Sequence, residues 1–190
     1  MKQPTLTTER LTLRPFCLSD AKEVQRLAGN RSIADTTLNV PHPYEDGMAE
    51  GWIQTHTPKY RSGELAAFAI VEQSSDNLLG AVGITISQQF HRADIGYWIG
   101  VPYWGQGFCT EASKRIVDFA FSALGLHRVT AYHLARNPAS GRVMEKIGMT
   151  KEGLLRDHTY RWGKHEDLVA YGILATDQQK SEQAMRGNRR

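Results

Sequence analysis

Residues 103–112 read Tyr103-Trp104-Gly105-Gln106-Gly107-Phe108-Cys109-Thr110-Glu111-Ala112, and this stretch decides the fold. The segment before it, 92–99, has the pattern of a strand, and apolar residues at helical spacing follow over 108–123. A strand therefore leads through a turn with two glycines directly into a helix. Such a turn leaves unpaired backbone N–H groups at the positive end of the helix dipole, and glycine lets an anion approach the backbone closely. The stretch predicts a phosphate or pyrophosphate site.

The loop alone leaves its ligand open. A Walker loop would end in Gly-Lys-Ser/Thr, whereas Phe108 follows Gly107 here, which argues against a nucleoside triphosphatase. A Rossmann fingerprint needs three spaced glycines in an early βαβ unit, whereas this loop has two and lies past the middle of the chain. From these residues alone, a helix-capping turn without a ligand is an equal alternative.

Around this stretch, the periodicity predicts one α/β (α+β) domain in which helices flank a mixed sheet. Strands are expected at 11–14, 66–71, 78–86, 92–99, 129–133, 154–162 and 168–175. Helices are expected at 20–28, 45–61, 108–123 and 138–147. The segment 30–44 is rich in turn residues and is expected to be irregular. The domain is expected to span 1–176, with a basic, flexible tail over 177–190.

Composition excludes several classes of protein. The chain has 190 residues, of which 41% are hydrophobic and 23% charged, as in a single soluble domain. It has no apolar run near the ~18 residues that a membrane span needs, and no secretory signal at its start. Cys17 and Cys109 stand apart from any metal-ligand spacing, so we expect a cytoplasmic protein without disulfides or a metal. The net charge of +3 comes with a basic tail, and no nucleic-acid partner is expected.

Other motifs accompany this stretch in a fixed order. They are Thr8-Glu9-Arg10-Leu11-Thr12-Leu13-Arg14-Pro15, Ile95-Gly96-Tyr97-Trp98-Ile99, residues 103–112, Asn137-Pro138-Ala139-Ser140 and Glu145-Lys146-Ile147-Gly148-Met149. Together they resemble the GNAT family of N-acetyltransferases, in particular its ribosomal-protein-type (RimJ/RimL-like) subgroup, over about Leu6 to Leu174. The resemblance implies a GNAT-like mixed, mostly antiparallel central sheet. It also implies transfer of an acetyl group from acetyl-CoA to a primary amine, either a protein N-terminus or a small molecule.

The resemblance further implies which residues hold acetyl-CoA as co-substrate. The family's Gln/Arg-x-x-Gly-x-Gly/Ala loop falls on 104–109, where Trp104 replaces a polar residue and Cys109 a small one. The pyrophosphate is expected at the backbone N–H groups of Gly105, Gln106, Gly107, Phe108, Cys109 and Thr110. The pantetheine arm is expected between the backbone of Trp98, Ile99 and Val101 on one side and Asn137 and Ser140 on the other. It would lie in a V-shaped opening between the strands at 92–99 and 129–133.

Two proton transfers are expected, because the ammonium must lose a proton and the departing thiolate must gain one. Many family members use a tyrosine as the acid, and this chain has Met144 there. The subgroup uses a serine, which falls on Ser140, although this hydroxyl would equally suit a helix cap or a CoA contact. The subgroup's glutamate base is missing at about Thr159. The candidate bases are Asp157, His158 and Asp94, and deprotonation through water is an equal alternative.

The acceptor pocket is expected to be lined by Thr36, Thr37, 41–44 and 160–162. The leading hypothesis is an N-acetyltransferase. The tyrosine lost at Met144 motivates a second one, a non-catalytic acyl-CoA-binding sensor. A third is an RNA or ribosome interaction module that uses the basic tail at 180–190. A homodimer is left open.

Overall fold

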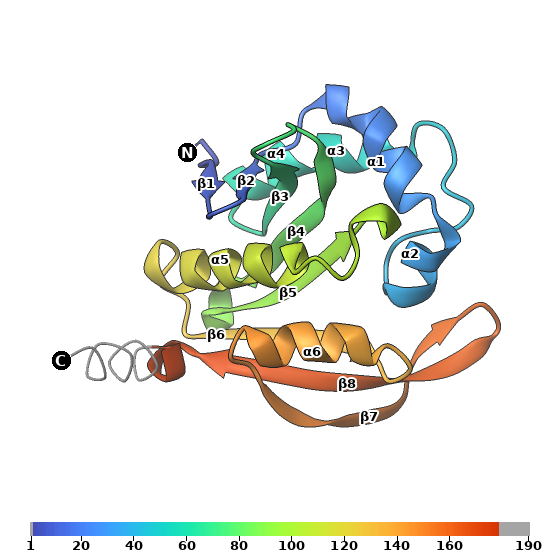
Figure 1. Cartoon of the computed structure of the whole chain (residues 1–190). Helices are drawn as coiled ribbons and strands as arrows, with labels where there is room; N and C mark the ends of the chain where they lie inside the picture. Colours follow the sequence, from blue (N-terminus) through green and yellow to red (C-terminus); the bar gives the residue numbers. More distant parts are fainter. Residues whose placement is uncertain (1, 179–190) are drawn as a thin grey trace.

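Eight strands form one sheet, in the order β1-β2-β3-β4-β5-β6-β8-β7, in the computed structural model, which describes residues 2–178 (Figure 1). The strands are β1 (Leu6–Thr7), β2 (Leu11–Arg14), β3 (Leu65–Glu72), β4 (Leu78–Ser87), β5 (Arg92–Ile99), β6 (Arg128–Leu134), β7 (Thr150–Arg161) and β8 (Lys164–Leu174). All neighbouring strands are antiparallel except β5 and β6, which are parallel. This confirms the expected mixed, mostly antiparallel sheet in a single α/β domain. Of the expected tail at 177–190, only residues 177 and 178 belong to the described part of the chain.

Helices cover both faces of the sheet. They are α1 (Ala21–Ala28), α2 (Arg31–Thr36), α3 (Met48–Gln54), α4 (His56–Arg61), α5 (Phe108–Ser122) and α6 (Pro138–Lys146). On one face, Ile116 and Phe119 of α5 belong to the same buried cluster as Phe68 of β3 and Ile95 of β5. On the other face, the buried residues of α1 and α3 cluster with Trp98 of β5. Alternation along β5 therefore sends Ile95 toward α5 and Trp98 toward α1 and α3.

The parallel pair in the centre separates along its length. On one side, β5 pairs with β4 over its whole span, Arg92 to Ile99. On the other side it pairs with β6 only from Arg92 to Asp94, whereas β6 continues to pair with β8 as far as Leu134. The second halves of β5 and β6 thus diverge, and this gives the V-shaped opening that the motifs predict.

Two expectations about the region between β2 and β3 are wrong. The segment 30–44 is not wholly irregular, because Arg31–Thr36 forms α2, capped by the Asn30 side chain, which accepts from Ser32 N at 2.9 Å. A helix of six residues is too short for its periodicity to stand out. The single helix expected over 45–61 is two helices, and α3 starts only after Gly47, which has a φ of +84°.

The final hairpin is longer than the sequence predicts. The strand β7 starts at Thr150 rather than at 154, and β8 starts at Lys164 rather than at 168. The extra residues of β7 are mostly exposed, because this strand lies at the edge of the sheet. An exposed edge strand lacks the apolar alternation by which strands are recognised. Within residues 2–178, no helix has the length and apolar character needed to cross a membrane.

Candidate active site

The turn before α5 presents a row of free backbone donors. In the described part of the chain, no acceptor lies within hydrogen-bond reach of the N–H groups of six consecutive residues, 105–110, and the first N–H of the helix to be paired is that of Glu111, with Gly107 O at 3.1 Å. Gly105 and Gly107 have φ values of +76° and +82°, which residues with a Cβ rarely adopt. The indole N–H of Trp104 donates to Ile99 O at 2.5 Å and ties the turn to the end of β5.

The N-terminal motif holds this turn in place. The Glu111 carboxylate accepts hydrogen bonds from Thr8 Oγ1 at 2.6 Å and from Arg10 N at 2.9 Å, and it forms an ion pair with the Arg10 guanidinium at 2.7 Å. Burial would raise the pKa of Glu111, but the hydrogen bonds from Thr8 and Arg10 outweigh it and lower that pKa. Arg10 also donates to Gln106 O at 3.1 Å and lies over the Phe108 ring at 4.5 Å. The expected anion site is therefore braced by a segment about a hundred residues away.

Cys109 offers only its backbone to this turn. Its side chain is partly buried, and burial raises the pKa of the thiol to about 12. The thiol therefore stays protonated near neutral pH and is a poor nucleophile.

A cavity of about 810 Å³ lies on the face of the sheet that carries α1 and α3, and it extends into the opening between β5 and β6. The part of its lining that comes from the sheet, its floor, includes four small residues, Ala67, Ala81, Gly83 and Gly96. The opposite wall is the segment from Thr36 to Pro41, followed by Tyr44 and Trp52. Of the expected lining, the structure places Thr36, Thr37, Pro41 and Tyr44 at the cavity, whereas His42, Pro43 and residues 160–162 do not line it.

Two hydroxyl groups meet at the end of the cavity where the strands diverge. Ser140 lies in the first turn of α6, and its Oγ is 2.9 Å from the hydroxyl of Tyr97 on β5. The Tyr97 hydroxyl is also 3.2 Å from the Ser140 carbonyl oxygen, to which it donates. Burial raises the pKa of Tyr97, so its hydroxyl stays protonated. Met144 is buried next to this pair and lines the same cavity.

The three candidate bases lie in different places. Asp94 is half-buried and lines the cavity, and its Oδ1 accepts a hydrogen bond from Thr130 Oγ1. Asp157 and His158 are exposed in an irregular part of β7, and neither is among the described residues that line the cavity. The partner of Thr159 across the hairpin is Glu166, but that carboxylate is engaged by Arg136 and Lys164.

Of the residues expected along the pantetheine arm, some line the cavity and others do not. Trp98 lines the cavity, and the carbonyl of Ile99 is engaged by Trp104. Asn137 does not line the cavity. Its Nδ2 donates to Thr36 O at 3.1 Å, and its Oδ1 accepts a long hydrogen bond of 3.4 Å from Ser140 N. The side chain of Asn137 thus joins the start of α6 to the end of α2.

Two residues that line the cavity, Tyr97 and His133, are not among the site residues predicted from the sequence. Tyr97 lies within a motif that the sequence had singled out, and alternation along β5 places it on the side of α5, away from Asp94 and Trp98. His133 on β6 is buried, and its Nδ1 is 2.8 Å from Leu134 O. Because a carbonyl can only accept, Nδ1 carries the proton in the neutral ring and Nε2 is left as the acceptor. Nothing in the local pattern of β6 distinguishes His133 from a core histidine.

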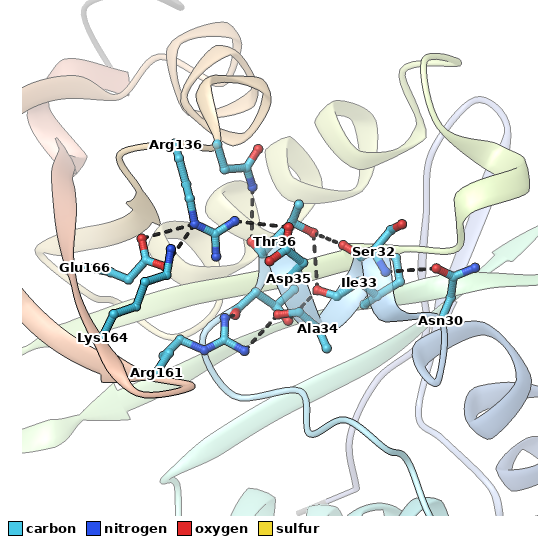
Figure 2. A network of polar contacts seen from close by, with 12 residues as sticks. Asn30, Ser32, Ile33, Ala34, Asp35, Thr36, Arg136, Arg161, Lys164 and Glu166 are labelled. Atoms are coloured by element: carbon cyan, nitrogen blue, oxygen red, sulfur yellow. Dashed lines mark hydrogen bonds and ion pairs between the residues drawn. The ribbon is translucent and has the colours of Figure 1, made fainter.

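The wall segment is clamped from outside by a polar network, shown in Figure 2. Arg161 of β7 donates to Ala34 O at 2.8 Å and also to Thr37 O, which are carbonyls at the C-terminal end of α2. Arg136 forms ion pairs with Asp35 at 3.1 Å and with Glu166 at 3.0 Å. A guanidinium at the C-terminus of a helix satisfies free carbonyls and the helix dipole together. The position of the wall therefore depends on α6 and on the final hairpin.

Comparison with known proteins gives the family. The model of the acetyltransferase (GNAT) domain matches residues 10–150. The uncharacterized N-acetyltransferase p20 of Bacillus licheniformis is 33% identical over 172 residues, which cover 90% of this chain and 96% of that protein. The spermidine N(1)-acetyltransferase of Vibrio cholerae is 26% identical over 166 residues, with 87% and 93% covered.

A solved structure agrees at the level of the fold. RimL, a ribosomal L7/L12 alpha-N-protein acetyltransferase in complex with coenzyme A, matches with a TM-score of 0.83 at 19% identity and covers 90% of this chain and 98% of that one. The matched domain contains the glycine turn, the diverging strands β5 and β6, and the start of α6. The chain therefore belongs to the GNAT acetyltransferase family and is an N-acetyltransferase.

Proposed function

We propose that the protein transfers the acetyl group of acetyl-CoA to a primary amine by direct attack on the thioester. The observation that carries this proposal is the divergence of β5 from β6, with the free N–H row of 105–110 at the end of β5 and the Ser140–Tyr97 pair inside the opening. The turn before α5, the unpaired edge of β5 and the Ser140 hydroxyl of α6 thus supply an anion site, a strand edge and a proton donor around one opening.

The co-substrate fits these features in order. The six free N–H groups at the positive end of α5 suit a pyrophosphate. Beyond Asp94, β5 has no strand partner on the side of β6 within residues 2–178, so its edge is free to pair with the amide groups of the pantetheine arm. Trp98 and Val101 belong to this proposed contact. Asn137 would contribute through Oδ1, since its Nδ2 is already held by the Thr36 carbonyl.

The chemical step forms a C–N bond and breaks the C–S bond of the thioester. The thiolate leaves with the electron pair of the C–S bond and takes a proton that we assign to Ser140 Oγ. Ser140 regains a proton from the attacking nitrogen, which loses its second proton as the amide forms. Tyr97 orients that hydroxyl through the 2.9 Å hydrogen bond. The ammonium proton goes to Asp94, directly or through water, because among Asp94, Asp157 and His158 only Asp94 lines the cavity. Most of the rate acceleration then comes from holding amine and thioester together.

The relatives support the reaction and leave the acceptor open. The name of the spermidine N(1)-acetyltransferase gives a small polyamine as its acceptor, and the name of RimL gives a protein N-terminus. The alternative of a non-catalytic acyl-CoA sensor rested on the tyrosine lost at Met144. The Ser140–Tyr97 pair supplies a hydroxyl at the cavity and weakens that motive.

The test is thiol release from acetyl-CoA in the presence of a panel of primary amines, with wild type compared with Ser140→Ala. We expect turnover by the wild type and a fall in kcat of about 10²-fold in the variant, the usual size for loss of a general acid. Ser122→Ala, at the exposed end of α5, is the matched control and should keep full activity. Acetyl-CoA binding without thiol release on any amine would favour the sensor and contradict this proposal.

A further inference from the structure

The cavity carries little charge for its size. Among the described residues that line it, Asp94 is the one carboxylate, and there is no lysine or arginine. The other titratable groups that face the cavity are His133 and the tyrosines Tyr44, Tyr97 and Tyr132. In the described part of the chain, the Oδ1 of Asp94 accepts from Thr130, and its Oδ2 has no hydrogen-bond donor or cation within reach. One anionic oxygen is therefore free to receive one ammonium group.

The remainder of the cavity suits a carbon skeleton. Asp94, Gly96 and Trp98 alternate along β5 and so point to the same face. A Cβ at Gly96 would meet no atom within 4 Å, which shows open space directly beside the carboxylate. Beyond it lie Ala67 and Ala81 on the floor and Trp52 on the wall. An ammonium bound at Asp94 would extend its body over apolar and aromatic surface.

We propose that the acceptor is a primary monoamine with an apolar body, and that Asp94 selects it by pairing with its single ammonium group. This inference rests on the proposed function, whose acceptor site is this cavity. It argues against a polyamine, because a second ammonium in the cavity would have no carboxylate partner. An unpaired charge in an apolar site is strongly disfavoured.

The charged residues near the wall also disfavour binding of a polyamine. Arg136, Arg161 and Lys164 lie beside α2 (Figure 2) and are not among the described residues that line the cavity, and Arg31 lies over the ring of Trp162 at 5.8 Å. The carboxylates among them, Asp35 and Glu166, are already engaged in ion pairs. The acidic residues of the segment before α3 and of α3 itself, Glu45, Asp46 and Glu50, do not line the cavity. A polycation reaching past the wall would therefore meet cations.

The test uses two acceptors that differ in one group, n-hexylamine and 1,6-diaminohexane, which replaces the terminal methyl of hexylamine by a second aminomethyl group. Binding of each to the protein saturated with CoA is measured by calorimetry, and turnover with acetyl-CoA is measured separately. We expect hexylamine to bind and to react at least tenfold better than the diamine. Asp94→Asn should lower hexylamine binding by a similar factor while leaving the affinity for CoA unchanged.

A negative charge added to the wall should reduce the preference for hexylamine over the diamine. Asn39 is exposed and lines the cavity opposite the floor, so Asn39→Asp supplies a second carboxylate with almost no change in shape. We expect it to improve diamine binding relative to hexylamine by several fold. The matched control is Asn77→Asp in the turn between β3 and β4, which does not line the cavity and should change neither ratio.

The two readouts separate this inference from the proposed function. Selective hexylamine binding without turnover on any amine would sink the acetyl transfer and support the monoamine site. Turnover with equal or better use of the diamine would keep the transfer and overturn the monoamine site. Failure of both amines to bind, or hexylamine binding that is unchanged in Asp94→Asn, would also overturn it.

Discussion

The two sides of the opening are built in different ways. The turn at 104–110 takes its shape from local sequence, because two glycines at positive φ stand directly before a helix, and long-range contacts of Thr8 and Arg10 with Glu111 then brace it. The opposite wall, 36–41, has no such local determinant. It is held by side chains that come from more than a hundred residues along the chain, Arg136, Asn137 and Arg161. The proposed co-substrate side is therefore predictable from local sequence, whereas the proposed acceptor side depends on contacts with α2 made by residues at the start of α6 and in the final hairpin.

Of the variants that should affect one side of the opening and not the other, Arg161→Met is expected to have the largest effect. The variant removes two charge-assisted hydrogen bonds to the carbonyls of Ala34 and Thr37. The wall should then lose its position, and the acceptor KM should rise about tenfold, which is the scale of one hydrogen bond to a charged group. The affinity for acetyl-CoA should stay within experimental error, because Arg161 is remote from the turn at 104–110.

Arg156→Met is the control for this variant, since Arg156 is exposed on the same strand. Steady-state kinetics with both substrates varied will separate the two effects. A parallel loss of acetyl-CoA affinity in Arg161→Met would show that the two sides are coupled, contrary to this description.

Much of the fold follows from periodicity and turn chemistry. The expected strand at 92–99 matches β5, and the helix at 108–123 matches α5 to within one residue. The prediction of the candidate site from the sequence is less complete than that of the fold. Ser140, which the motifs suggest, and Asp94, a candidate base on the central strand, both line the cavity. Tyr97 and His133 were not predicted, because a buried aromatic or histidine on a strand has the pattern of a core residue. Asp157 and His158 lie close in sequence to the missing glutamate position, yet β7 carries them away from the cavity.

A smaller effect is expected when the pH is lowered, and it should appear in the free energy of unfolding. His56 of α4 is buried against Phe16 and Trp52, and neither ring nitrogen has a hydrogen-bond partner in the described part of the chain. Burial lowers the pKa of His56 to about 4, below the value of 6.5 that applies to the unfolded chain. The unfolded state therefore binds the proton more readily, and stability falls as the pH drops from 6.5 toward 4.

At pH 5.5 this group should remove about 1 kcal/mol from the free energy of unfolding, and His56→Leu should remove that part of the acid sensitivity. Urea unfolding of both proteins at pH 7.5 and pH 5.5 measures the difference. His42→Leu, which changes an exposed histidine, is the control. An identical pH dependence for wild type and His56→Leu would contradict the assignment.

The measurement that bears most directly on the central claim is the affinity for acetyl-CoA of Gly107→Glu, determined by calorimetry beside wild type and Gly163→Glu. Gly107 and Gly163 have nearly the same positive φ, +82° and +83°, so both variants place a side chain at a left-handed position and add the same charge. Only the first places a carboxylate at the row of free N–H groups. We expect micromolar binding by wild type and Gly163→Glu, on the order of 8 kcal/mol, and no measurable binding by Gly107→Glu. Equal binding by both variants would show that the pyrophosphate does not lie on this turn.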